Sequence, residues 1–69
     1  MKNLVRERRE ALGWSRWDLG VEAGVQPGLL IRIERAEATP RLDVAAKLAC
    51  ALGSTLGELW PALATQEVA

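Results

Sequence analysis

The sequence predicts an all-α fold made of five short helices. Apolar residues recur at helical spacing in five segments, and none of these segments alternates with the period of two that a strand requires. Helix-breaking residues separate the segments at Gly13, Gly24, Pro40, Gly53 and Pro61. In two places a serine or threonine is followed three residues later by an acid, which is typical of a helix start.

Length and composition are those of one globular domain. The chain has 69 residues, of which 49% are hydrophobic and 26% are charged, a balance that excludes a disordered tail. No apolar run approaches the ~18 residues of a membrane span. The charged N-terminal segment has no apolar core like that of a signal peptide, so we expect a cytoplasmic protein. A core this small is marginal, and dimerisation would help to stabilise it.

Residue usage argues against catalytic or metal chemistry. Histidine is absent and cysteine occurs once, which excludes an internal disulfide and disfavours a zinc site or a Ser-His triad. We therefore expect no cofactor, no metal and no catalysis. The net charge is zero, but residues 1–35 carry seven basic and five acidic groups, whereas residues 36–69 carry two and four. A neutral total can hide a basic face.

The first two segments have clear boundaries. The first runs from about Lys2 to Leu12, and Gly13 is its stop. The second begins with a capping box, in which Ser15 precedes Asp18 by three residues. Its buried stripe is expected at Leu19 and Ala23, and Gly24 ends it.

The third segment starts at Gln26 and Pro27, because proline at the first helical position loses no helical hydrogen bond. Its apolar side holds Leu30 and Ile33, and it ends near Arg35 before a loop over residues 36–40.

The fourth segment, about Leu42 to Leu52, stops at Gly53. Its expected buried residues are Leu42, Ala45, Ala46, Ala49 and Leu52. The fifth opens with a capping box of Thr55 and Glu58, and Pro61 keeps it short or kinked. We expect a domain over residues 1–61 and a fraying tail over residues 62–69.

The stretch from Arg16 to Ile33 has the spacing of a helix-turn-helix. Where the two helices cross, the first needs a side chain no larger than alanine, and Gly20 meets that need. The turn needs one residue with positive φ, which Gly24 adopts without strain. Val25, Leu30 and Ile33 then anchor the second helix, which in such motifs enters the DNA major groove.

Residues along most of the chain resemble the Cro/repressor-type (XRE-type) helix-turn-helix family. The matching residues are Arg9, Gly13, Ser15, Leu19, Ala23, Gly24, Val25, Ile33, Glu34, Arg35, Pro40, Ala51, Leu52, Gly53, Leu56, Glu58, Leu59 and Trp60. The resemblance covers about residues 4–60. It implies a compact five-helix bundle of the lambda repressor-like type, usually a DNA-binding homodimer and often a transcriptional repressor.

The same resemblance implies roles for individual residues. Arg16 stands at the start of the second helix, where the family contacts the DNA backbone and sometimes a base. The groove-facing positions of the third helix hold Gln26, Pro27, Gly28, Ile31 and Arg32. Arg41 stands where the next loop usually touches phosphate. Arg9 and Glu34 match a pair that commonly forms a partly buried salt bridge.

Several positions depart from the family pattern. Pro27 and Gly28 have no hydrogen-bonding side chain, which leaves Gln26 and Arg32 as direct readers of adenine and guanine. Ile31 fits either a thymine methyl or a protein contact. Ala36 replaces the glycine usual after the third helix, and Glu37 adds a negative charge where phosphate passes.

The three tryptophans and the cysteine have competing interpretations. We expect Trp14 to cover the core, and Trp60 to lie in the core or at a dimer interface. Trp17 either donates its indole N–H to a phosphate or shields the helix end. Cys50 is expected to be a buried structural thiol.

Three function classes follow. The favoured one is a double-stranded DNA-binding homodimer whose interface is a C-terminal apolar patch of Leu56, Leu59, Trp60 and Leu63. A second is a protein-interaction or antitoxin-like module on the same fold, which the apolar triplet Leu29, Leu30 and Ile31 favours. A small enzyme is the least favoured.

Overall fold

The computed structural model of the chain describes the backbone of residues 2–66 and the side chains of residues 2–63. Its elements are α1 (Val5–Ala11), α2 (Arg16–Ala23), α3 (Pro27–Glu34), α4 (Leu42–Leu52), α5 (Leu56–Leu59) and α6 (Pro61–Gln66). No strand occurs in the described part of the chain, so the all-α prediction is confirmed. Both predicted capping boxes are present, at Ser15 and Thr55.

Helix α6 was not predicted. Trp60 has φ −123° and ψ 82°, an extended conformation of the kind that the residue before a proline prefers. Pro61 therefore ends α5, as expected, but it also begins a further helix, a position that proline tolerates. The predicted tail from residue 62 is helical as far as Gln66, and residues 67–69 lie outside the described residues.

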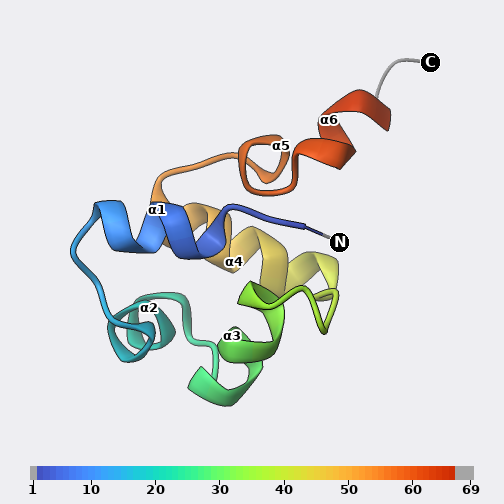
Figure 1. Cartoon of the computed structure of the whole chain (residues 1–69). Coiled ribbons are helices and arrows are strands. Elements are labelled where there is room, and N and C mark those ends of the chain that lie inside the picture. Colours follow the sequence, from blue (N-terminus) through green and yellow to red (C-terminus); the bar gives the residue numbers. More distant parts are fainter. Residues whose placement is uncertain (1, 67–69) are drawn as a thin grey trace.

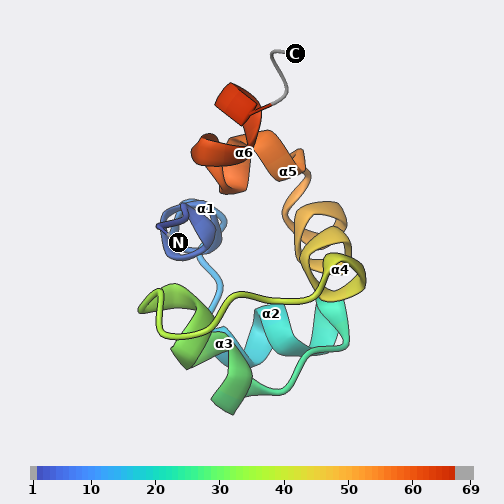
Figure 2. The ribbon, with the colours of Figure 1, turned by 90° about the vertical axis from the view of Figure 1, so that its right-hand side faces the viewer.

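The helices surround one core. Helix α2 packs on both α3 and α4, and α1 contacts the same two helices from the other side. In Figures 1 and 2, α2 and α3 form the lower end of the molecule, and α5 and α6 form the upper end. The buried hydrophobic residues are Val5, Leu19, Ala23, Val25, Leu30, Ile33, Ala45, Leu48, Ala49, Leu52, Leu59 and Trp60.

The buried stripe of α4 differs from the predicted one. Leu42 is 73% exposed and Ala46 is exposed, while Leu48 is fully buried. Helical side chains lean toward the N-terminus, so Leu42 at the first position leans beyond the end of the helix. Ala46 lies about 100° around the helix from Ala45, and alanine is small enough for either side.

The prediction that Cys50 is buried is also wrong, because the residue is exposed in the structure. It follows the buried Ala49 by one residue and so turns away from the core. Trp14 is half-buried and packs against the core, in keeping with its expected role as a cover.

The turn after α3 contains a backbone conformation that suits glycine. Ala36 has φ 60°, the only positive φ of a non-glycine residue in the described chain. The Ala36 N–H donates to the carbonyl of Ile33, and the Glu37 N–H donates to that of Arg32. These bonds close the end of α3 and hold alanine where the family usually has glycine.

Candidate nucleic-acid interface

The start of α2 is fixed by its capping box. The Ser15 hydroxyl oxygen accepts from the Asp18 N–H at 3.1 Å, and the Ser15 N–H donates to the Asp18 carboxylate at 2.8 Å. These two reciprocal hydrogen bonds satisfy two backbone N–H groups that a helix start leaves without a partner. It also fixes the backbone of Arg16 and Trp17 in the first turn of α2.

The turn between α2 and α3 is tighter than the sequence predicts, because an alanine at Gly20 was expected to fit. Gly24 has φ 70°, and the Val25 N–H donates to the Gly20 carbonyl at 2.9 Å. A Cβ atom at Gly20 would lie 2.6 Å from the carbonyl oxygen of Val25, which is too close for any side chain. The absence of a side chain at Gly20 is therefore what lets the turn approach α2.

Helix α3 has distinct inner and outer sides. Leu30 and Ile33 are buried, which fixes the helix against the core. The groove-facing candidates behave differently: Gln26, Gly28 and Arg32 are exposed, and Pro27 and Ile31 are half-buried. The N-terminal end of α3 lies at the lower extremity of the molecule in Figures 1 and 2.

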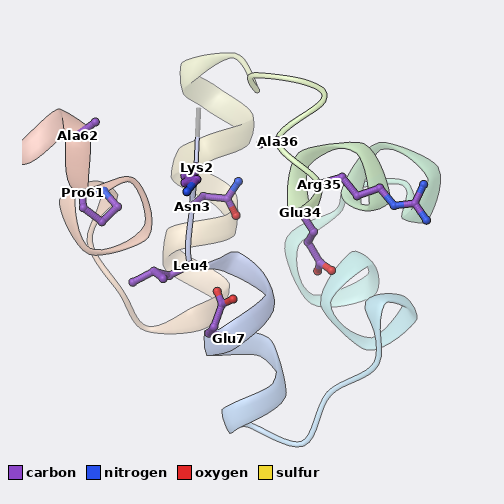
Figure 3. A pocket seen from close by; sticks show the side chains of 9 residues that line it. All are labelled: Lys2, Asn3, Leu4, Glu7, Glu34, Arg35, Ala36, Pro61 and Ala62. Atoms are coloured by element: carbon purple, nitrogen blue, oxygen red, sulfur yellow. The ribbon is translucent and has the colours of Figure 1, made fainter.

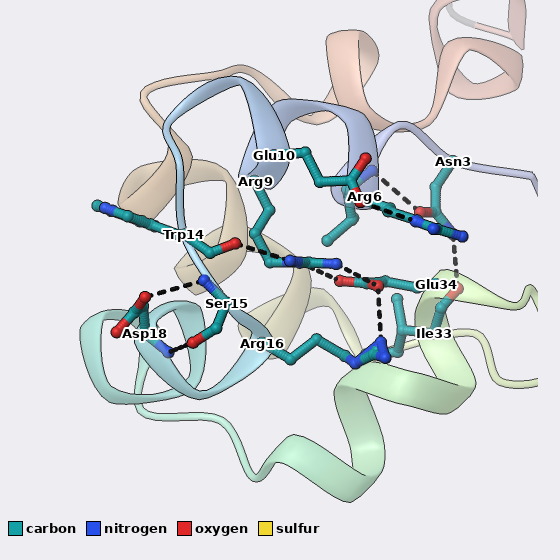
Figure 4. A network of polar contacts seen from close by, with 11 residues as sticks. Asn3, Arg6, Arg9, Glu10, Trp14, Ser15, Arg16, Asp18, Ile33 and Glu34 are labelled. Atoms are coloured by element: carbon teal, nitrogen blue, oxygen red, sulfur yellow. Dashed lines mark hydrogen bonds and ion pairs between the residues drawn. The ribbon is translucent and has the colours of Figure 1, made fainter.

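A buried ion pair holds α3 to α1. Arg9 Nε lies 2.9 Å from Glu34 Oε2 and Arg9 Nη2 lies 3.2 Å from Glu34 Oε1, so the pair is bidentate (Figure 4). The two side chains are only 8% and 4% exposed. The hydrogen bond to Glu34 raises the pKa of Arg9 above its ordinary value. The predicted salt bridge is therefore present, and it fixes helix geometry.

Two further hydrogen bonds near this pair were not predicted. Arg9 Nη1 donates to the carbonyl of Trp14 at 2.7 Å, and the Asn3 amide donates to the carbonyl of Ile33 at 2.7 Å. The Asn3 side-chain oxygen also accepts a hydrogen bond from the Val5 N–H, at the first residue of α1. A lone asparagine before a helix suggests a cap, but no sequence signal indicates its bond to the end of α3.

Arg16 faces both the fold and the solvent. Its guanidinium lies 3.8 Å from the Glu34 carboxylate, yet 42% of its side chain is exposed. Arg16 and Ile31 line a small hollow of about 130 Å³ together with Arg6, Glu34 and Arg35. Glu34 is already paired with Arg9, and Arg6 with Glu10 at 3.1 Å, so the excess positive charge belongs to Arg16 and Arg35.

The remaining predicted contacts lie at two other places. Arg41 is exposed at the N-cap of α4. Trp17 is 68% exposed and Val21, one turn later on α2, is 66% exposed. Sequence reasoning missed Val21, although its distance of four residues from Trp17 could have shown that the two share a face.

The predicted dimer residues are not one exposed patch. Leu59 and Trp60 are buried in the protomer's own core, so they form no exposed patch, and for Trp60 the core was one of the two expected places. Leu56 and Leu63 are half-buried against the same core. Helix α6 extends the C-terminal end, and the sequence analysis did not predict this helix.

A larger hollow lies elsewhere, between the N-terminal segment, the end of α3 and the start of α6 (Figure 3). It has about 650 Å³ and both signs of charge in its lining, from Lys2, Glu7 and Arg35. This mixture indicates no single class of ligand. Across the described residues, no group of three or more acidic or cysteine side chains could hold a metal ion. No helix described by the structure has the length and hydropathy of a membrane span.

Comparison with known proteins identifies the architecture. No curated protein matches the chain. A family model described as helix-turn-helix matches residues 5–59, which is most of the chain and runs from the start of α1 to the end of α5. The chain therefore belongs to the helix-turn-helix family of the Cro/repressor (XRE) type.

Proposed function

We propose that the chain binds double-stranded DNA in a sequence-specific way, as a homodimeric transcriptional repressor acting in the cytoplasm, with no catalytic step. Helix α3 lies in the major groove, with Gln26 and Arg32 reading bases. Arg16 contacts the DNA backbone beside them. Arg41 and Trp17 are two further DNA contacts. Membership of a DNA-binding family supports the binding itself.

The observation that carries the proposal is the exposure of Arg32 on a helix whose other side is fixed. No ion pair engages Arg32 among the described residues, and the residue is exposed. An arginine on a groove-inserted helix can donate two hydrogen bonds to guanine. A buried inner side at Leu30 and Ile33 limits how far α3 can move, which favours a defined contact over a diffuse one.

Two further features support docking of the backbone. Arg16 and Arg35 converge beside Ile31, so positive charge borders α3 where phosphates pass. Pro27 and Gly28 add little bulk at the N-terminal end of α3, and no atom lies within 4 Å of a Cβ at Gly28. The helix can thus approach the groove closely.

The proposed dimer uses the C-terminal end of the protomer. Leu56 and Leu63 are its half-buried apolar residues, next to the core residues Leu59 and Trp60. To read two half-sites, such a two-fold dimer has to present its two α3 helices on one face of the duplex, about one helical turn apart. Sedimentation at high protein concentration, with and without duplex DNA, should show a dimer. A strict monomer in both conditions, binding DNA one to one, contradicts the pairing.

Selection of bound fragments from random duplex DNA tests the function. We expect a recurrent motif with a guanine, and two half-sites about 10 base pairs apart if the protein dimerises. Fragments with no recurrent motif would reject sequence-specific binding.

One observation favours the alternative of a protein-interaction module. Trp17 and Val21 are exposed beside the acidic residues Asp18 and Glu22, and such a surface also suits a protein partner. The triplet Leu29, Leu30 and Ile31 no longer favours it, because Leu30 is buried. Retention on heparin or non-specific DNA at low salt separates the two classes, since a DNA binder is held there.

A further inference from the structure

An apolar hollow separates α2 from the N-terminal end of α3. The exposed Trp17 and Val21 line it together with the half-buried Pro27 and the buried Gly20 and Val25. None of these five residues is charged. A hollow with this lining can accept an apolar group but offers almost nothing to a phosphate.

The size of the hollow limits what it can hold. It has about 140 Å³. Pockets for drug-sized ligands hold about 300–1,000 Å³, so this hollow takes a chemical group and not a whole small molecule. Because the Val25 N–H is already hydrogen-bonded to the Gly20 carbonyl at 2.9 Å, the turn cannot move closer to α2 and deepen the hollow.

The position of the hollow identifies the group. In a helix-turn-helix the N-terminal residues of the second helix meet base edges, while the first helix crosses the backbone. The hollow has Pro27 of the second helix on one side and Trp17 and Val21 of the first on the other. With α3 in the major groove as proposed, the hollow would face the side of the groove where base edges meet the backbone.

DNA displays one apolar group in that groove, the C5-methyl of thymine. Building on the proposed function, we infer that Trp17, Val21 and Pro27 read a thymine through its methyl group. Val21 is then a specificity-determining residue, and Trp17 acts through its apolar ring.

The acidic neighbours agree with this placement. Asp18 and Glu22 line a separate hollow on the other side of Trp17 and Val21. Phosphates are repelled from that side, which keeps the backbone toward Arg16 and leaves the apolar hollow over the base edges. The Trp17–Val21 row thus separates an acidic side of α2 from the DNA-facing side.

Deoxyuridine substitution tests the inference, because it removes the methyl and leaves the base's hydrogen bonds unchanged. Each thymine of a selected duplex is replaced in turn, and binding is titrated by fluorescence anisotropy. We expect one position per half-site at which the wild-type protein loses about three- to tenfold in affinity, the scale of one buried methyl. Trp17→Ala and Val21→Ala should bind the parent duplex more weakly and lose most of this sensitivity, as coupled groups do.

Controls separate the readout from folding and from general DNA affinity. Leu12→Ala removes exposed apolar surface at the end of α1, outside this hollow, and should keep both affinity and deoxyuridine sensitivity. Trp17→Phe should keep the sensitivity because an aromatic ring remains. Thermal melts show that each variant is folded, which the exposure of Trp17 and Val21 leads us to expect.

Three results would overturn the inference while leaving sequence-specific binding intact. One is a selected motif without a recurrent thymine. Another is a wild-type protein that is indifferent to deoxyuridine at every position. The third is full affinity in Trp17→Ala and Val21→Ala, which would instead assign this face to a protein partner. A protein that binds no duplex rejects the proposed function and the inference together.

Discussion

Two regions of the molecule differ in how their side chains are paired and buried. One is the junction of α1 with α3, and the other is the outer side of α2 and α3. At the junction, Arg9 and Glu34 are almost fully buried and every strong donor has a partner within the chain. No buried side-chain polar atom in the described residues lacks a hydrogen bond. On the outer side, Arg32 and two large apolar side chains, Trp17 and Val21, are left to solvent. The junction therefore determines where α3 lies, and the outer side is available for binding.

The largest effect should come from breaking the junction. Glu34→Lys places a cation beside the buried Arg9, and loss of a buried pair costs about 3–5 kcal/mol. A domain of this size has a stability of roughly 3–10 kcal/mol, so most of the protein should unfold. Thermal unfolding followed by circular dichroism measures this. The double variant with Arg9→Glu should recover only part of the lost stability, because Arg9 also donates a hydrogen bond to the Trp14 carbonyl. An unchanged melting temperature in Glu34→Lys would refute the role of the pair.

The close approach of the turn to α2 should give the next largest effect. In Gly20→Ala the new methyl would lie 2.6 Å from a backbone oxygen, which cannot rotate away. We expect destabilisation by about 1–3 kcal/mol, the usual cost of overpacking. Gly28→Ala is the matched control, because a Cβ added at Gly28 would meet open space. This variant should change the stability little. Equal denaturant midpoints for the two variants would contradict the account of the crossing.

Ala36 offers a substitution in the stabilising direction. Its φ of 60° costs an L-residue about 1–2 kcal/mol, and glycine avoids this cost at the expense of greater freedom in the unfolded chain. Ala36→Gly should therefore gain up to about 1 kcal/mol. Gly53→Ala, at φ 63°, is the reverse test and should lose a similar amount. Urea titration checks both signs, and a loss of stability in Ala36→Gly would argue against the left-handed turn.

The smallest effect concerns the cap of α5. Hydrogen bonds from Thr55 lower the pKa of the Glu58 carboxyl below its ordinary value of 4.5, and Arg8 adds to this. Because the folded pKa is lowered, the stabilisation is present above pH 4.5 and is lost as the pH falls through the folded pKa. Glu58→Gln keeps the cap without the charge, so the wild-type advantage should shrink below pH 4.5. A difference in melting temperature between the wild type and Glu58→Gln that stays constant from pH 3 to 7 would contradict this.

Local signals predicted most of the fold. Proline and glycine positions and the two capping boxes depend on backbone geometry within a few residues, so the starts of α2, α3 and α5 were readable from sequence. Side-chain burial on α4 was not, because alanine fits either side and Leu42 lies at a helix end. Helix α6 was missed because Pro61 both stops one helix and starts another.

The candidate site was predictable where a family pattern fixes a residue and not where tertiary packing decides. The Arg9–Glu34 pair followed from resemblance, whereas its bonds to Trp14 and the role of Asn3 depend on how α1 meets α3. Trp17, Val21 and Pro27 form one face only because α2 and α3 cross as they do, and the spacing of residues in the sequence does not reveal how the helices cross.

The central claim is that the outer side of α3 binds DNA while its inner side only holds the helix. Arg32→Ala tests this most directly, by titration against a selected duplex beside a thermal melt. We expect affinity to fall by about 1–3 kcal/mol, with relaxed preference at one base position and an unchanged melting temperature. Lys47→Ala removes the same charge from the exposed side of α4 and should leave both affinity and preference nearly unchanged. Full affinity and full base preference in Arg32→Ala would contradict the account.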